Sequence, residues 1–130
     1  MNREIKFRAK PNNSNEWIYG DLTSHRTVSP KNGKFIYHKD ERTGWGCFRV
    51  QLNTIGQYIG LKDRDGKEIY ENDIVRILAY NFDDEELFVV KYNINTARYE
   101  LVNDDLIVSF DNVYNYEVKI VGNIYDNNED

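Results

Sequence analysis

The chain contains very few cysteines, methionines and prolines. Its 130 residues include one cysteine, one methionine and two prolines. The single cysteine, Cys47, excludes an intramolecular disulfide and any site built on a CxxC pair. No apolar run approaches the roughly 20 residues that a membrane helix needs, and no charged-then-apolar leader precedes Ile5. We therefore predict a cytoplasmic protein, bacterial or in a phage-infected host cell, that contacts no membrane.

Composition and charge exclude further classes of protein. The hydrophobic fraction of 40% and the charged fraction of 30% are typical of a folded globular chain. The formal net charge of -5 repels a phosphate backbone, which excludes broad coating of DNA. Ten tyrosines and six phenylalanines favour half-buried, pleated strands over helices.

Short alternating or aromatic runs recur at the spacing of strands in a small β-domain. They predict strands at residues 4–9, 17–22, 35–37, 48–52, 54–61, 87–92, 99–102 and 116–125, and a turn feeding a strand over residues 69–78. Residues 104–110 are a short element of uncertain type, which could be a strand leading into a turn at residues 111–112. One short helix is allowed, in residues 23–46 or 104–110. The predicted fold class is therefore mainly β, or α+β with one short helix.

Two turns are predicted in the middle of the chain. Asp65 and Gly66 form an Asp-Gly pair between two apolar runs, which predicts positive φ angles at the tip of a tight hairpin. Asn72 precedes the next strand and tolerates a left-handed backbone. We assign all three residues a structural role.

The N-terminal strand alternates basic and apolar residues. Arg3, Lys6, Arg8 and Lys10 could form a local basic patch in an acidic protein. We favour a simpler interpretation, in which these residues line the solvent face of an edge strand.

Three segments together resemble the YopX family of phage and prophage proteins. They are residues 3–9 with Trp17 and Gly20 behind them, residues 55–75, and residues 122–125. The resemblance spans the chain and implies one domain, residues 1–130. Within it, residues 1–52 form an N-terminal β region, residues 53–125 resemble an SH3-like barrel, and residues 126–130 are an acidic tail.

The resemblance does not imply any particular activity, and the expectation that the protein is not an enzyme depends on the absence of catalytic motifs from the sequence. The chain departs from the family pattern at two positions. Asn72 replaces a usual glycine, and Lys10 stands where a tryptophan is frequent. Asn adopts the same backbone angles as glycine, so the turn at residue 72 is expected to survive.

The candidate metal sites do not have the residue spacing of known motifs, and the candidate catalytic carboxylates have a simpler structural interpretation. Asp63, Asp65 and Gly66 do not match a calcium loop, since the glycine comes two residues early. His25, His38 and Cys47 match no zinc motif. Glu68, Glu71 and Asp73 could serve metal-assisted hydrolysis, but an acidic residue entering a strand more often accepts backbone N–H groups. We predict no catalytic residue, no metal and no cofactor.

Tyrosines are the remaining functional hint, because they are apolar in body and polar at the tip, as interfaces require. Eight of them are more than one small core can bury: Tyr58, Tyr70, Tyr80, Tyr92, Tyr99, Tyr114, Tyr116 and Tyr125. The candidate binding residues are Tyr58, Tyr70, Glu71, Asp73, Tyr92 and Tyr99. The leading hypothesis is a non-enzymatic module that binds a protein partner or forms a homo-oligomer. The alternatives are a nucleic-acid-binding small barrel and the hydrolase built on Glu68, Glu71 and Asp73.

Overall fold

The structure is a computed structural model that describes residues 4–23, 34–40, 44–79, 82, 86–110 and 113–126. These residues are mainly β, and the only helices among them are single 3₁₀ turns, none long and apolar enough to cross a membrane. The predicted mainly β class is confirmed. The chain divides into two compact units, Met1–Tyr58 and Ile59–Asp130.

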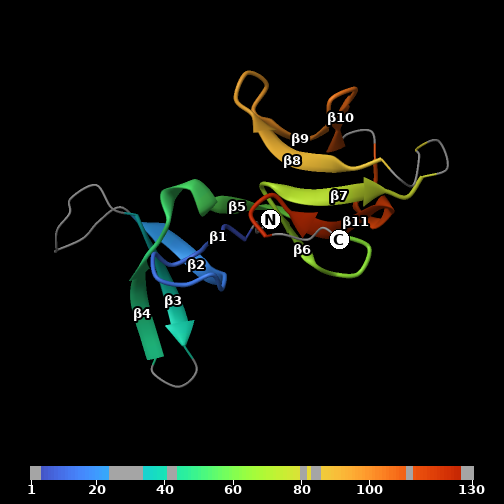
Figure 1. The fold of residues 1–130 in the computed structure, drawn as a ribbon. Helices are drawn as coiled ribbons and strands as arrows, with labels where there is room; N and C mark the ends of the chain where they lie inside the picture. The colour runs from blue at the N-terminus through green and yellow to red at the C-terminus, as the bar shows by residue number, and fades with distance from the viewer. Residues whose placement is uncertain are drawn as a thin grey trace. The chain divides into compact units, whose positions relative to one another are not determined.

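The first unit is an antiparallel sheet with strand order β4-β3-β2-β1-β5 (Figure 1). Its strands are β1 (Phe7–Ala9), β2 (Ile18–Thr23), β3 (Phe35–Asp40), β4 (Gly44–Arg49) and the start of β5 (Gly56–Lys62), with the 3₁₀ turn η1 at Leu52–Thr54. Ala9, Ile36 and Val50 form its core. Gly20 in β2 lies so close to the carbonyl oxygen of Tyr37 in β3 that a side chain at residue 20 would collide with backbone. This contact explains the glycine in the N-terminal family segment.

The predicted edge position of the first strand is wrong. β1 lies between β2 and β5, with Phe7 opposite both Gly20 and Gln57. Arg8 and Lys10 are only 6% and 7% exposed. The Arg8 guanidinium carbon lies 4.4 Å and the Lys10 ammonium nitrogen 5.1 Å from the centre of the Trp17 ring. The face of the Trp17 ring compensates part of the free-energy cost of burying the two cations. Arg8 and Lys10 can therefore lie on an interior strand without being exposed to solvent.

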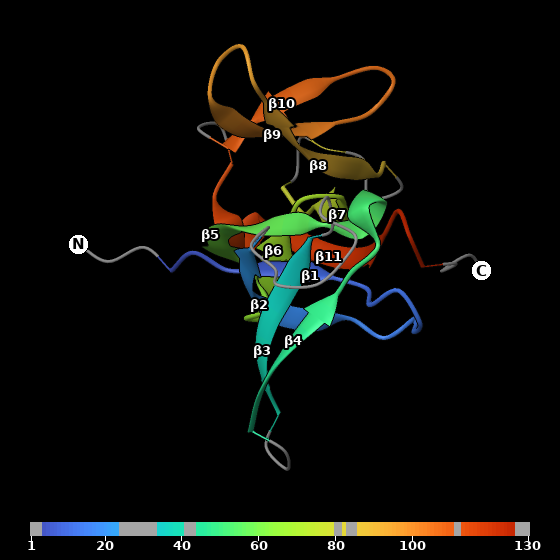
Figure 2. The ribbon, with the colours of Figure 1, turned by 90° about the vertical axis from the view of Figure 1, so that its left-hand side faces the viewer.

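The second unit contains a five-stranded antiparallel sheet with order β10-β9-β8-β7-β11. These strands are β7 (Asp73–Ile77), β8 (Phe88–Asn93), β9 (Arg98–Val102), β10 (Ile107–Ser109) and β11 (Val118–Asn123); β6 (Glu68–Tyr70) precedes them, and η3 spans Asn115–Glu117. Figure 2 shows β8, β9 and β10 as successive neighbours. Alternate residues of each strand face one apolar core, which includes Val75, Ile77, Phe88, Val90, Leu101 and Val118.

Several sequence predictions are refined by these elements. Residues 35–37 belong to a longer hairpin, β3 and β4, and residues 107–109 form a strand followed by a 3₁₀ residue at Phe110, so the described parts of the two candidate helix segments contain no α-helix. The predicted strand over residues 48–52 ends at Arg49, and Leu52 begins η1. Arg3, His25, Tyr80, residues 83–85 and most of the acidic tail, residues 127–130, lie outside the described residues. The SH3-like barrel implied for residues 53–125 stays a prediction.

Candidate functional site

The second unit carries a groove of about 460 Å³, within the range of sites that accept a side chain or a small ligand. The end of β5, the turn between β8 and β9, and the strands β9 and β10 contribute its lining residues: Ile59, Leu61, Thr96, Ala97, Arg98, Tyr99, Ser109 and Phe110. Most of these side chains are apolar or aromatic. Arg98 and Ser109 supply polar groups on one side, where an Arg98 guanidinium nitrogen donates to the Ser109 hydroxyl at 3.4 Å.

The turn that closes one end of the groove has an unusual backbone. Its N–H groups bond back to Asn93: the Ala97 N–H donates to the Asn93 carbonyl at 2.8 Å, and the Asn95 N–H to the Asn93 side-chain oxygen at 2.9 Å. These bonds hold Ala97 at a φ of 59°, a left-handed conformation that alanine rarely adopts. Backbone of this kind often marks a functional surface, and here it forms part of the groove wall.

Two of the predicted binding tyrosines lie at this groove. Tyr92 and Tyr99 are directly opposite on β8 and β9. Their ring centres are 5.1 Å apart at an angle of 65°, an edge-to-face contact. Tyr99 is half-buried and lines the groove, while Tyr92 is 43% exposed beside it. The sequence identified these tyrosines, but it did not place Ile59, Leu61 or Phe110 around them.

The two other candidate binding tyrosines, Tyr58 and Tyr70, are buried, so the expectation that they are exposed is wrong. Tyr58 and Tyr70 are 7% and 2% exposed. The Tyr70 hydroxyl donates to the Glu68 carboxylate at 2.9 Å, which satisfies the polar tip and permits burial.

The predicted carboxylates take structural positions in the turn between β6 and β7. Buried Asp73 accepts a 2.8 Å hydrogen bond from the Tyr70 backbone N–H, and Glu71 is half-buried in the turn. Asn72 in the same turn has a φ of 71°. Across the described part of the chain, no three histidine, cysteine or acidic side chains gather as metal ligands would.

The hairpin of residues 63–67 has a longer tip than the predicted two-residue turn. The Asp63 N–H donates to the Lys67 carbonyl at 2.7 Å, and the Gly66 N–H to the Asp63 carbonyl at 3.0 Å. Gly66 has a φ of 84°, but Asp65 does not take a positive φ. The tip is therefore the three residues Arg64, Asp65 and Gly66, a type I turn closed by a left-handed glycine, rather than a two-residue Asp-Gly turn.

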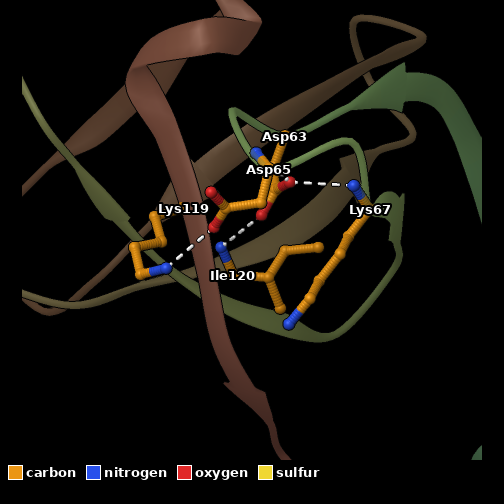
Figure 3. A network of polar contacts seen from close by, with 5 residues as sticks. All are labelled: Asp63, Asp65, Lys67, Lys119 and Ile120. Atoms are coloured by element: carbon orange, nitrogen blue, oxygen red, sulfur yellow. Dashed lines mark hydrogen bonds and ion pairs between the residues drawn. The ribbon is translucent and has the colours of Figure 1, made fainter.

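Asp63 organises this hairpin with its buried side chain (Figure 3). One carboxylate oxygen accepts the Asp65 and Lys67 N–H groups at 2.8 and 2.9 Å, and the other accepts the Ile120 N–H at 3.0 Å. The Asp65 carboxylate lies 2.8 Å from the Lys119 ammonium group. That hydrogen bond holds the pKa of Asp65 below its ordinary value. An Asx residue opening the turn was the sequence signal for Asp63.

Comparisons with known proteins identify the family. No curated protein matches the chain. A solved structure, the crystal structure of protein EF1440 from Enterococcus faecalis, is similar with a TM-score of 0.60 at 24% identity over 98% of each chain, which shows a shared fold. The model of the family described as YopX protein matches residues 6–129. The chain therefore belongs to the YopX protein family.

Proposed function

We propose that this protein is a non-enzymatic binding module that engages a protein partner, or a second copy of itself, through the groove beside Tyr92 and Tyr99. The observation that carries the proposal is the aromatic pair itself. One ring lines the groove while the other stays 43% exposed at its side. Tyrosine in such a place offers a large apolar surface together with a hydroxyl, the combination enriched at protein interfaces.

The groove chemistry favours a particular kind of contact. Ile59, Leu61 and Phe110 suit an apolar or aromatic side chain of the partner. Arg98 adds a charged donor at the exposed end of β9, which suits a carbonyl or carboxylate next to that side chain. A partner segment with one bulky apolar residue beside an acidic one fits both features.

The family adds a setting to this proposal. The resemblance implies a phage or prophage origin, and hence activity in the cytoplasm of a bacterial or phage-infected cell. A partner is then a phage or host protein present in that cell. The proposal includes neither a metal nor another cofactor.

Site-specific photocrosslinking tests the proposal directly. We would place a photoreactive amino acid at Thr96, an exposed groove residue, and in a matched protein at Tyr37, an exposed residue of the first unit. The proposal expects a discrete crosslinked protein from position 96 and none from position 37, with the product lost in a Tyr99→Ala background. Crosslinks of equal yield from both positions would refute it.

Self-association needs a separate measurement. Light scattering coupled to size-exclusion chromatography over a range of concentrations reports the mass in solution. If the occupant is a second copy, the mass rises with concentration and Tyr99→Ala returns it to the monomer. A monomer at every concentration, together with no crosslink from position 96, would rule out both forms of the proposal.

A further inference from the structure

A second aromatic surface lies apart from the groove, around the 3₁₀ turn η3. Tyr114 and Tyr116 stack with ring centres 5.1 Å apart and only 6° between the ring planes. They are 65% and 62% exposed, so the stack is not part of the core. The turn that presents them is held by the Glu117 N–H donating to the Tyr114 carbonyl at 2.9 Å and by the Glu117 carboxylate accepting the Tyr114 N–H at 3.0 Å. The stack is therefore built on an ordered backbone.

The hairpin tip of residues 62–67 is anchored beside this stack. The Asn115 side-chain amide, between the two tyrosines in sequence, donates to the Lys62 carbonyl at 2.8 Å. The Arg64 N–H donates to the Val118 carbonyl at 2.9 Å, immediately after η3. Two hydrogen bonds thus hold the tip and the aromatic turn together.

The same tip concentrates positive charge in a protein of net charge -5. Lys62, Arg64 and Lys67 are all exposed. Asp65 is the exposed acidic residue of this tip, and its carboxylate is paired with Lys119 at 2.8 Å. Asp63, the other acidic residue of the tip, is buried and accepts three backbone N–H groups. Residues 62–67 therefore present three exposed cations against two carboxylates, a formal charge of +1.

We propose that Tyr114, Tyr116, Lys62, Arg64 and Lys67 form a patch that binds single-stranded nucleic acid. Every base has a π-face that can stack on a tyrosine ring, and the cations of the tip meet the phosphates on either side. An acidic peptide could use the cations but has no need of parallel exposed rings. The patch is distinct from the groove, so this function goes beyond the proposed protein binding. Because the whole molecule is acidic, binding is confined to low ionic strength and is strongly salt-dependent.

Fluorescence anisotropy with a labelled oligothymidylate of about 12 nucleotides tests the proposal. Replacing both Tyr114 and Tyr116 by alanine should weaken binding at least about tenfold, and replacing both by tryptophan should retain it. Arg64→Glu with Lys67→Glu should abolish binding. The slope of log affinity against log salt should be about −2 for three phosphate contacts. Tyr37→Ala, at an exposed tyrosine of the first unit, is the matched control and should bind as the unmodified protein does.

Three results would overturn the proposal. The first is unchanged affinity in the double alanine variant, with thermal melting showing that it is folded. The second is equal binding of a labelled polyglutamate peptide, which would mean a cation cluster that selects no bases. The third is the absence of oligonucleotide binding at low salt. None of these results bears on crosslinking from position 96, so the two functions are tested separately.

Discussion

The carboxylate of Asp63 accepts a 3.0 Å hydrogen bond from the backbone N–H of Ile120, 57 residues further along the chain. β11 is an edge strand of the five-stranded sheet, and this bond and the one from Arg64 to Val118 use groups on it that the sheet leaves open. Exposed strand edges invite pairing with other chains, so the hairpin tip covers a vulnerable edge. The central family segment, residues 55–75, thus covers the open edge of β11 in addition to presenting the exposed cations of the hairpin tip.

Asp63→Asn should lower the free energy of unfolding by about 1 to 3 kcal/mol, because an amide NH₂ would replace one of the two accepting oxygens. Three backbone N–H groups depend on that carboxylate. Asp105→Asn, at an exposed turn position, is the control and should change stability by less than about 0.5 kcal/mol. Urea denaturation measures both, and hydrogen exchange at Ile120 should accelerate only in the first variant. Equal stability of the two variants would contradict the role of Asp63.

Gly66→Val should destabilise the protein by about 1 to 3 kcal/mol, since a β-branched residue would be forced to a φ of 84°. A side chain at this position would meet no atom within 4 Å, so the cost is conformational rather than steric. Gly66→Asn is the matched variant and should cost clearly less, because Asn tolerates this region. If thermal melts showed that Gly66→Asn lowers stability as much as Gly66→Val, the positive φ at residue 66 would not explain the loss.

Asn72→Ala should be more destabilising than Asn72→Gly. Both lose the 2.8 Å bond from the Asn72 amide to the Tyr125 hydroxyl, at about 0.5 to 1.5 kcal/mol. Asn72→Ala should lose about 1 kcal/mol of further stability, because alanine is strained at the φ of 71° that residue 72 adopts. A double-mutant cycle of Asn72→Gly with Tyr125→Phe, followed by urea denaturation, should show coupling. Independent, additive effects would mean that the side-chain bond contributes nothing.

Ala97→Gly should raise stability by up to about 1 kcal/mol, which is opposite to the usual effect of glycine. Glycine relieves the left-handed φ of 59° at this position of the groove wall. Thr96→Gly, at the neighbouring exposed position, should lower stability by about 0.5 to 1 kcal/mol. Calorimetry of the two variants gives the comparison, and a loss of stability in Ala97→Gly would contradict the strain argument.

The Asp65–Lys119 pair should stabilise the fold only above acidic pH. The Lys119 hydrogen bond lowers the pKa of Asp65 from its ordinary value of 3.8. The stabilising contribution is therefore present above that value and is lost as pH falls through the lower folded pKa. The Tm difference between the unmodified protein and Lys119→Gln should be small but measurable at about pH 6 and absent at about pH 2. High salt should reduce it as well, and a difference that grows on acidification would contradict the assignment.

Local patterns in the sequence were sufficient for several strands and for the positions of two turns, although not for β4, β10 or the length of the hairpin tip. Alternating residues predicted β2, β8 and β9 to within a residue or two. The turn chemistry at Gly66 and Asn72 predicted two of the three positive φ angles in residues 55–75, because few residues other than glycine and asparagine adopt them; the third, at Gly60, was not predicted. Family membership likewise followed from segments that are continuous in sequence.

By itself the sequence therefore determined the mainly β class, the central turns and the family. Only the tertiary structure decided which side chains meet. It buried Tyr58 and Tyr70, stacked Tyr114 on Tyr116, and placed β1 in the interior of a sheet rather than at its edge. Alternation tells which residues share a face of a strand, but not which strand lies beside it. The groove and the patch both combine residues from distant segments, and that pairing depends on strand order, which local periodicity does not encode.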